Sequence, residues 1–332
     1  MRNIIMPQRF DLVSIDKWCI KLDSIEMDEE CSFDYSSVTF FEPAGMLLCS
    51  AKIRQFIELH PNIRFSNTGF HQHTYAANMG FFQSVYQDYG KSPGEAPGNV
   101  NYLPISRINV SEVRRRARTD SKHIVDTLEE EAQRLSVVLS RNDSILKTLL
   151  TYTIRELLRN VVEHSFAQEI WYAGQFWPTK NRVEIAILDE GIGIYGSLKK
   201  NTKLCIKNNE DAVRASILPG ITSVRSPDPN DDYANSGYGL YLIRRIAVDA
   251  GDFVIISNDC LLGSNKLKPE IIGPASFHGT LIRVRLNTQS IPSLNKQLPI
   301  YIYEGERLAK KVRKNAIVTA SQISRLISDG YE

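Results

Sequence analysis

The sequence predicts a mixed α/β fold made of two units. The first observation is that short strand and helix patterns alternate over residues 35–90. The second is a pair of long amphipathic stretches, residues 120–140 and 145–165, followed by an alternating strand pattern. The third is a proline- and glycine-rich stretch between the two regions. With 332 residues, 42% of them hydrophobic, the chain is long enough for two domains of ordinary size.

The first unit is expected to be a small α/β domain. Its patterns follow the order strand 37–42 (SVTFFE), helix 44–59, strand 62–66 (NIRFS) and helix 75–89. The stretch 91–104, KSPGEAPGNVNYLP, breaks regular structure and indicates a boundary or a connecting loop. We therefore expect an N-terminal α/β domain over residues 1–118.

The second unit begins with two helices and continues into a sheet. Its patterns follow the order helix 120–140, helix 145–165, strand 182–188 (RVEIAIL), helix 239–249, strand 252–257 and strand 280–286. In the last of these, Ile282 and Val284 alternate with Arg283 and Arg285, which is typical of a sheet with one buried face. We expect this domain to span residues 119–290, and residues 291–332 to add a strand and a basic helix.

Composition narrows the classes of partner. The formal net charge of +2 is too small to indicate nucleic acid, and the basic runs 114–118 and 310–314 are expected to be solvated helix faces. The five cysteines are scattered and form no C-x-x-C pair, so neither a zinc site nor a disulfide framework is indicated. No apolar run reaches about 18 residues, and the N-terminus lacks a sustained apolar core. We expect a cytoplasmic protein without a membrane segment.

One helix carries polar residues at regular spacing. In RELLRNVVEHS, Glu156, Asn160 and His164 stand four residues apart and share one face of the helix. An amide oxygen is a hard ligand suited to Mg²⁺, and a carboxylate one turn away can orient or deprotonate a water molecule. The alternative reading is a plain polar helix edge.

Two glycine motifs follow along the chain. The first, with Gly191, Gly193 and Gly196 after a strand, matches a dinucleotide-binding G-x-G-x-x-G, but Asp189 and Glu190 precede it where a pyrophosphate would approach. In the second, NSGYGL, glycines precede a helix whose first N–H groups could bind an anion; a simple glycine cap is the alternative. The polar segment between the motifs, residues 196–236, is expected to form a lid or a loop.

A Rossmann fold remains a competing interpretation. Glu210 and Asp211, about 20 residues after the first motif, would then supply the acid that binds a ribose. This reading leaves the row on the 145–165 helix and the GYGL motif unexplained. No G-x-x-x-x-G-K-[ST] occurs, so a P-loop is not indicated.

Together these motifs resemble the GHKL family of ATP-binding proteins, which includes gyrase, heat-shock chaperones, histidine kinases, MutL and anti-sigma-factor kinases. The resemblance covers about residues 145–290. The matching residues are Glu156, Asn160 and His164 in the N box, Asp189, Gly191 and Gly193 in the D-x-G-x-G box, Gly237, Tyr238, Gly239 and Leu240 in the second glycine box, and Gly279 and Thr280 in the late Gly-Thr.

The resemblance implies a fold, two ligands and a set of roles. The fold is an α/β sandwich in which helices cover a mixed sheet, and the ligands are ATP and Mg²⁺. By analogy with the family, Asn160 binds Mg²⁺, Asp189 accepts a hydrogen bond from the adenine amino group, and Thr280 supports the adenine end. Glu156 inherits the role of the base that activates the nucleophile. The match of Gly196 to a third Rossmann glycine is then coincidental.

The branch of the family is less well defined. His123 lacks the H-E-x-x-T-P pattern of a sensor kinase phospho-acceptor. The N-terminal unit weakly resembles STAS-like anti-sigma antagonists, which would make Ser66 or Thr68 candidate phosphoacceptors, against the alternative of plain turn residues. We expect an ATPase or a serine/threonine-type kinase with a protein partner, and leave open a homodimer and a nucleotide-gated binding module without turnover.

Overall fold

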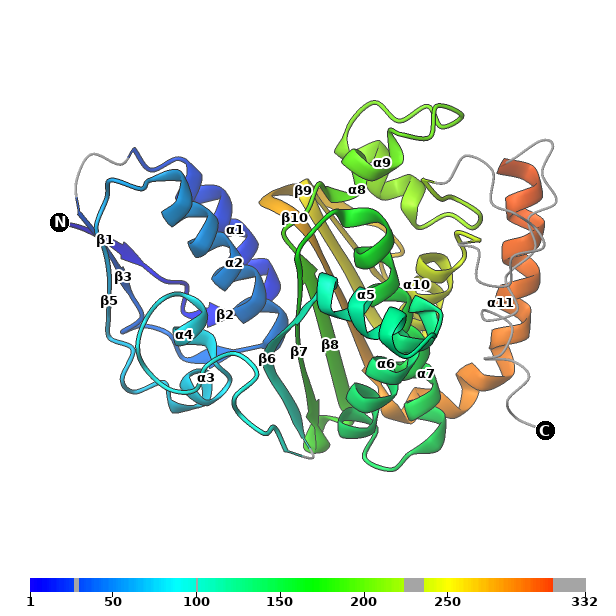
Figure 1. The fold of residues 1–332 in the computed structure, drawn as a ribbon, viewed down its shortest axis with the longest axis horizontal. Helices are drawn as coiled ribbons and strands as arrows, with labels where there is room; N and C mark the ends of the chain where they lie inside the picture. The colour runs from blue at the N-terminus through cyan, green and yellow to red at the C-terminus, as the bar shows by residue number, and fades with distance from the viewer. Residues whose placement is uncertain (27–29, 100, 224–235, 313–332) are drawn as a thin grey trace.

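A computed structural model of the chain describes residues 1–26, 30–99, 101–223 and 236–312, and it is mixed α/β, as expected (Figure 1). Part of the expected lid and most of the expected C-terminal basic helix lie outside these residues. None of the helices in the described ranges is both long and apolar enough to cross a lipid bilayer.

The N-terminal unit is built around a small parallel sheet. Strands β1 (Arg2–Ile5), β3 (Cys31–Asp34) and β5 (Phe65–Thr68) lie in the order β1-β3-β5, and helices α1 (Leu12–Asp23) and α2 (Pro43–Leu59) connect them. The minor elements are β2 (Arg9–Phe10), β4 (Phe40–Phe41), α3 (Thr74–Asn78) and α4 (Phe81–Ser84). Asp11 caps α1 by accepting a hydrogen bond from the Ser14 N–H, and Pro43 begins α2 at a position that needs no N–H donor.

Three local expectations for this unit are corrected. The helix expected over residues 75–89 is broken into α3 and α4, because Gly80 adopts a φ of 84° that ends the first helix. The strand expected at 37–42 shrinks to β4. Ser66 and Thr68 are not turn residues that follow a strand: they lie within β5, in register with Ser32 and Asp34.

The second sheet has five strands. They are β6 (Tyr102–Asn109), β7 (Glu169–Trp177), β8 (Arg182–Asp189), β9 (Gly251–Asn265) and β10 (Ile271–Asn287), in the order β6-β7-β8-β10-β9 with every neighbouring pair antiparallel. Strand β6 falls within residues 1–118, yet it pairs with β7 at the edge of this sheet. Its Pro104 fits an edge strand, which does not need every N–H in a ladder.

The remaining helices surround this sheet. They are α5 (Val110–Thr119), α6 (Ile124–Ser140), α7 (Ser144–Asn160), α8 (Gly193–Leu198), α9 (Asn209–Ser216), α10 (Gly239–Ala250) and α11 (Ile291–Val312), with short turns at Val161–Ser165, Pro178–Lys180 and Thr288–Ser290. Where a strand was expected after residue 290, α11 forms instead and packs against α10 and α7.

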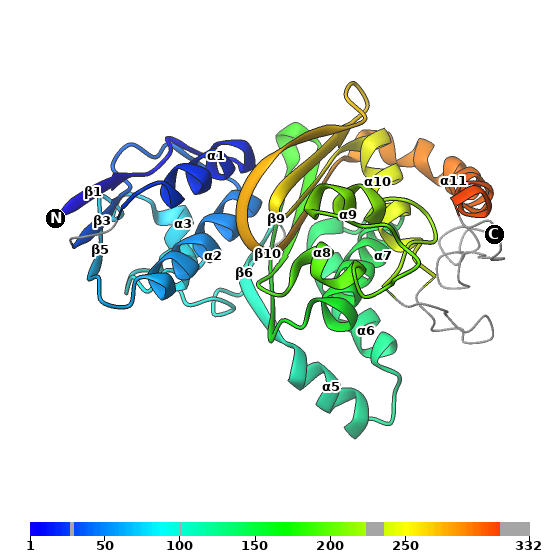
Figure 2. The same cartoon turned by 90° about the horizontal axis from the view of Figure 1, so that it is seen from above.

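The molecule is layered, and the five-stranded sheet is covered on both faces. Figure 1 shows α1 and α2 between the two sheets, and α6, α7 and α10 on the other side of the larger sheet; Figure 2 shows the same order from above. Side chains along β8 alternate accordingly. Ile185 and Ile187 belong to the helix-side core, whereas Ala186 and Leu188 belong to the core shared with the N-terminal unit. The N-terminal unit therefore packs directly on the back of the sheet.

Candidate functional site

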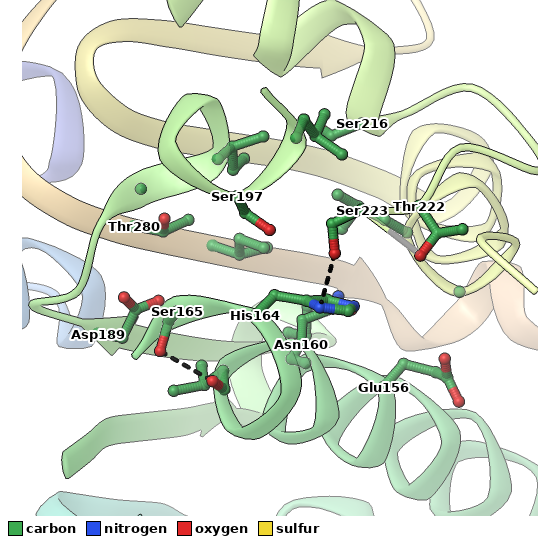
Figure 3. Close-up of a pocket in the computed structure, with 18 of the residues that line it drawn as sticks. Glu156, Asn160, His164, Ser165, Asp189, Ser197, Ser216, Thr222, Ser223 and Thr280 are labelled. Atoms are coloured by element: carbon green, nitrogen blue, oxygen red, sulfur yellow. Dashed lines mark hydrogen bonds between the residues drawn. The ribbon is translucent and has the colours of Figure 1, made fainter. Parts of the chain in front are cut away.

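One cavity brings the sequence motifs together between α7, the end of β8, the middle of β10 and the beginning of α10 (Figure 3). The expected site residues that line it are Glu156, Asn160, His164, Asp189, Gly193, Gly237, Gly239, Leu240 and Thr280. Three of the motif residues, Gly191, Tyr238 and Gly279, do not line it. Gly191 lies in the loop behind Asp189 and donates its N–H to that carboxylate, and the Tyr238 side chain is fully buried in the helix-side core.

Helix α7 presents the polar row to the cavity. The Asp143 side chain accepts a hydrogen bond from the Leu146 N–H, which starts the helix, and a π-helical turn at Val161–Ser165 ends it. The polar row continues into this turn, and such turns often occur at functional sites. Leu157 and Leu158 face the core, while Asn160 is partly exposed and its amide makes no hydrogen bond within the described residues.

His164 lies in the π-helical turn. Its Nδ1 is 3.1 Å from Ser223 Oγ, a contact drawn in Figure 3. Burial lowers the pKa of the imidazole below its ordinary value, so the ring is mostly neutral near pH 7. His164 can therefore act as a hydrogen-bonding wall of the cavity without adding a full charge.

Asp189 is a buried acceptor at the end of a strand. It pairs with Ile170 of β7 and Thr280 of β10, and it is 4% exposed. Burial is the main cause that raises the pKa of its carboxyl group to about 7; the hydrogen bond from Gly191 N–H to Oδ1, 2.9 Å long, opposes this rise, and the nearby Glu190 carboxylate adds a smaller contribution to it. Oδ2 makes no hydrogen bond within the described residues. An added donor would therefore stabilise the ionised form.

The neighbouring segment requires glycine. Gly279 has a φ of 126°, and a Cβ atom there would lie 2.1 Å from the Asp189 carbonyl oxygen. Thr280, next along β10, lies with its hydroxyl 3.3 Å from Ser257 Oγ, and the same serine accepts the Ile194 N–H. Gly279 thus lets β10 approach the end of β8 closely, and Thr280 places a hydroxyl beside Asp189.

Glu156 is held at the other end of the row. Its Oε1 accepts hydrogen bonds from Arg155 Nε at 3.2 Å and Nη2 at 3.1 Å, and Arg155 also binds Glu129. A Cβ atom on Gly239 would lie 2.2 Å from Glu156 Oε2. The carboxylate is therefore enclosed between an arginine and the first residue of α10.

The beginning of α10 lies at the cavity. Tyr238, the N-cap residue, makes no side-chain cap hydrogen bond, while Gly237, Gly239 and Leu240 line the cavity. The first N–H groups of a helix have no partner within the helix and favour negative charge. Gly220 donates its N–H to the Gly237 carbonyl at 3.0 Å, which links the chain before Gly220 to the start of α10. This part of the cavity is suited to an anion.

Several lining residues were not anticipated from the sequence. They are Leu157, Val161, Ser165, Ile187, Ile194, Ser197, Leu198, Ser216, Ile221, Thr222, Ser223 and Ile282. Most are apolar or carry a single hydroxyl, so the cavity is an apolar slot with a few fixed polar groups, which is typical of small-molecule sites. Ser197 and Ser216 come from the segment between the glycine motifs, where no periodic signal could identify them.

The donor set limits how a metal could bind. Within the described residues, no group of three or more His, Cys, Asp or Glu side chains is arranged to hold a metal ion. Asn160 offers one amide oxygen, so a cation bound here would need further ligands from a bound substrate or from water molecules. That is the usual mode of Mg²⁺ at phosphate sites.

No family model matches the chain, and no curated protein is significantly similar to it. The functional assignment therefore depends on the motifs and on the geometry of the cavity, which define an α/β protein with a buried carboxyl at one end of an apolar slot and a helix N-terminus at the other.

Proposed function

We propose that this chain binds ATP with Mg²⁺ in the manner of the GHKL family, and that it hydrolyses ATP or passes the γ-phosphate to a serine or threonine of a protein partner as a regulatory switch. The observation that carries the proposal is the carboxyl of Asp189, buried beside Thr280, with one oxygen that accepts no hydrogen bond within the described residues. We assign this activity to the cytoplasm, where ATP is abundant and the free cysteines stay reduced.

The Asp189 end of the cavity fits a purine base. Ile187, Ile194 and Ile282 provide apolar walls, which suit a flat aromatic ring. An exocyclic amino group would donate to Asp189, and a charge-assisted bond of this kind is stronger than a neutral one. This match of apolar walls and one acceptor supports adenine as the base.

The opposite end fits a phosphate chain. The N–H groups at the start of α10 favour anions, and Asn160 would hold the Mg²⁺ that accompanies the phosphates. The metal would neutralise phosphate charge and help orient the reacting group. Glu156, one turn from Asn160, would accept a proton from the attacking hydroxyl or water.

The architecture supports the family assignment as well. Helices α6, α7 and α10 cover one face of a five-stranded antiparallel sheet, and the motif residues meet between α7, α10 and the interior strands β8 and β10. We therefore propose the GHKL sandwich as the fold of the larger unit, and a STAS-like origin for the N-terminal unit that packs behind it.

One observation favours a second function, a nucleotide-gated interaction module with little turnover. Arg155 donates two hydrogen bonds to Glu156 Oε1, so this oxygen would have to exchange a partner before it could accept a proton from a nucleophile. In this state ATP would act mainly by changing the conformation of the chain. A protein partner or a second copy of the chain would then bind one conformation in preference to the other.

Incubation of the purified chain with γ-labelled ATP and Mg²⁺ distinguishes the two functions. Free labelled phosphate would identify an ATPase, and labelled protein, after addition of candidate partners, would identify a kinase. Binding of ATP without either product would favour the interaction module. Absence of ATP binding would contradict the whole proposal.

A further inference from the structure

Helix α2 of the N-terminal unit contacts both chain segments that build the Asp189 end of the cavity. The contacts come from two consecutive residues, Arg54 and Gln55. Neither residue was singled out by the sequence, and neither lines the cavity. Both lie more than 100 residues from the segments that they bind.

Arg54 is fixed from three directions. Its Nη2 lies 3.0 Å from Glu190 Oε2, its Nη1 donates to the Ser84 carbonyl at 3.2 Å, and its guanidinium lies 4.2 Å from the centre of the Trp171 ring. The side chain is 7% exposed in the shared core. Glu190 directly follows Asp189, so this ion pair fixes the loop that carries the buried carboxyl.

Gln55 holds the second segment. Its Nε2 donates to the His278 carbonyl at 2.8 Å, and its Oε1 accepts the His278 N–H at 3.1 Å. The same Nε2 lies 3.4 Å from Glu190 Oε1. His278 is two residues before Thr280, so one side chain links both segments.

The two segments also touch each other. The space that a Gly279 Cβ would occupy lies 2.1 Å from the Asp189 carbonyl oxygen and 2.9 Å from the Glu190 Cα. A shift of α2 cannot move one segment without pressing on the other, because close-packed interiors transmit displacements. The end of α2 and the Asp189 end of the cavity therefore form one mechanical unit.

We infer that the N-terminal unit controls the affinity of the cavity for nucleotide, with Arg54 and Gln55 as positioning residues that set Asp189 and Thr280. This inference rests on the proposed ATP binding. A ligand or partner that displaces α2 would change nucleotide affinity, and nucleotide would change the stability of α2 by the same coupling free energy.

Charge gives this coupling a signature that packing alone would not produce. Glu190, on the same loop, acts electrostatically on Asp189, and Arg54 of α2 forms an ion pair with Glu190; the other titratable side chains lining the cavity are Glu156 and His164. The facing positions on β7 and β10, Ile170 and Thr280, carry no charge. ATP binding is expected to strengthen as the pH rises and Asp189 ionises. Loss of Arg54 leaves the Glu190 charge uncompensated and should shift the midpoint of this transition to higher pH, whereas loss of the Glu190 charge should shift it to lower pH.

The test compares Gln55→Ala, Arg54→Gln and Glu190→Gln with the matched control Gln72→Ala, whose side chain hydrogen-bonds to the Ser36 carbonyl within the N-terminal unit. Calorimetry gives the Mg·ATP affinity from pH 5.5 to 8.5, and thermal unfolding gives stability. We expect Gln55→Ala to weaken ATP binding about tenfold, in line with the loss of hydrogen bonds worth roughly 1–1.5 kcal/mol. Gln72→Ala should bind like wild type.

Hydrogen exchange of the unmodified chain provides an independent readout. ATP should slow exchange at the C-terminal amides of α2, although α2 does not line the cavity. If Arg54→Gln fails to fold, Gln55→Ala and this measurement decide. Equal affinities and pH midpoints in all variants, with no protection of α2, would overturn the inference and leave ATP binding intact. Absence of ATP binding by wild type would overturn both.

Discussion

Gly239 lies directly against the carboxylate of Glu156. A Cβ atom at position 239 would lie 2.2 Å from Glu156 Oε2, although the two residues belong to different helices, α10 and α7, that are far apart in the sequence. The contact explains why glycine suits the first position of α10, where alanine would otherwise favour the helix. It also links the start of α10, where we propose that the phosphates bind, to the carboxylate proposed as the base.

Gly239→Ala should leave the protein folded but displace the carboxylate, because the clash is with the movable end of a glutamate side chain. We expect phosphate release or transfer to fall by about 10–100-fold, since the base loses its position. Steady-state turnover measures this effect. In a Glu156→Gln background the same substitution should have little further effect, and a full additional loss would show that Gly239 acts through something else.

Burial of Asp189 should make the free energy of unfolding of the nucleotide-free protein depend on pH. Its pKa of about 7 lies above the ordinary value of 3.8, so the folded chain retains a proton that the unfolded chain releases between about pH 4 and 7. The protonated Asp189 carboxyl therefore stabilises the folded chain at low pH, and this stabilisation is lost as the pH rises through 7. Without nucleotide, Asp189→Asn should be more stable than wild type at pH 8, by on the order of 2–4 kcal/mol, with a smaller difference at pH 4. Urea unfolding at both pH values measures the difference; a constant difference would contradict this account.

The same ionisation should appear in binding. A donor amino group favours the ionised carboxyl, so ATP affinity should rise as the pH increases through about 7. Because the phosphates of ATP also titrate near this range, adenosine is the better ligand for the comparison. The step should be absent in Asp189→Asn, and persistence of the step there would assign it to another group.

Asn160 and Glu156 should fail in different ways. Asn160→Ala removes the amide oxygen proposed for Mg²⁺, so ATP affinity should fall in the presence of the metal and change little when EDTA is present. Glu156→Gln should still bind Mg·ATP, while turnover falls by about 10²–10⁴. Calorimetry with and without metal, together with phosphate release, separates the two. Full turnover in Glu156→Gln would make that carboxylate a structural neighbour of Arg155 and no more.

The sequence predicted most closely those helices in which apolar residues recur at regular spacing. Helices α2, α6, α7 and α10 begin and end near the expected residues because apolar residues recur in each at helical spacing, although α2 is buried on nearly every side. Strand β7 was not identified, since it is buried on both faces: Ile170 packs on the helix side and Trp171 on the N-terminal side, so no alternation was visible. The break at Gly80 was visible in the sequence but was outweighed by the surrounding helical pattern.

The site was predicted where its residues occur in short motifs. Asn160, Asp189 and Thr280 meet in one cavity, as motif order and spacing suggested. The contribution of α2 could not be predicted from the sequence, because Arg54 and Gln55 have the pattern of ordinary polar residues in a helix. Only the packing of α2 on the sheet brings them to the Asp189 end of the cavity. Contacts over such sequence separations arise from tertiary packing and have no local signal.

A calorimetric titration of Mg·ATP into wild type and Asp189→Ala tests the central claim most directly. Loss of one charge-assisted hydrogen bond, worth about 1.5–3 kcal/mol, should weaken binding roughly tenfold to a hundredfold. NAD should bind wild type more weakly than ATP, because a carboxylate before the glycines would repel a pyrophosphate there. Equal ATP affinity in the two proteins, or tighter binding of NAD than of ATP, would contradict the account.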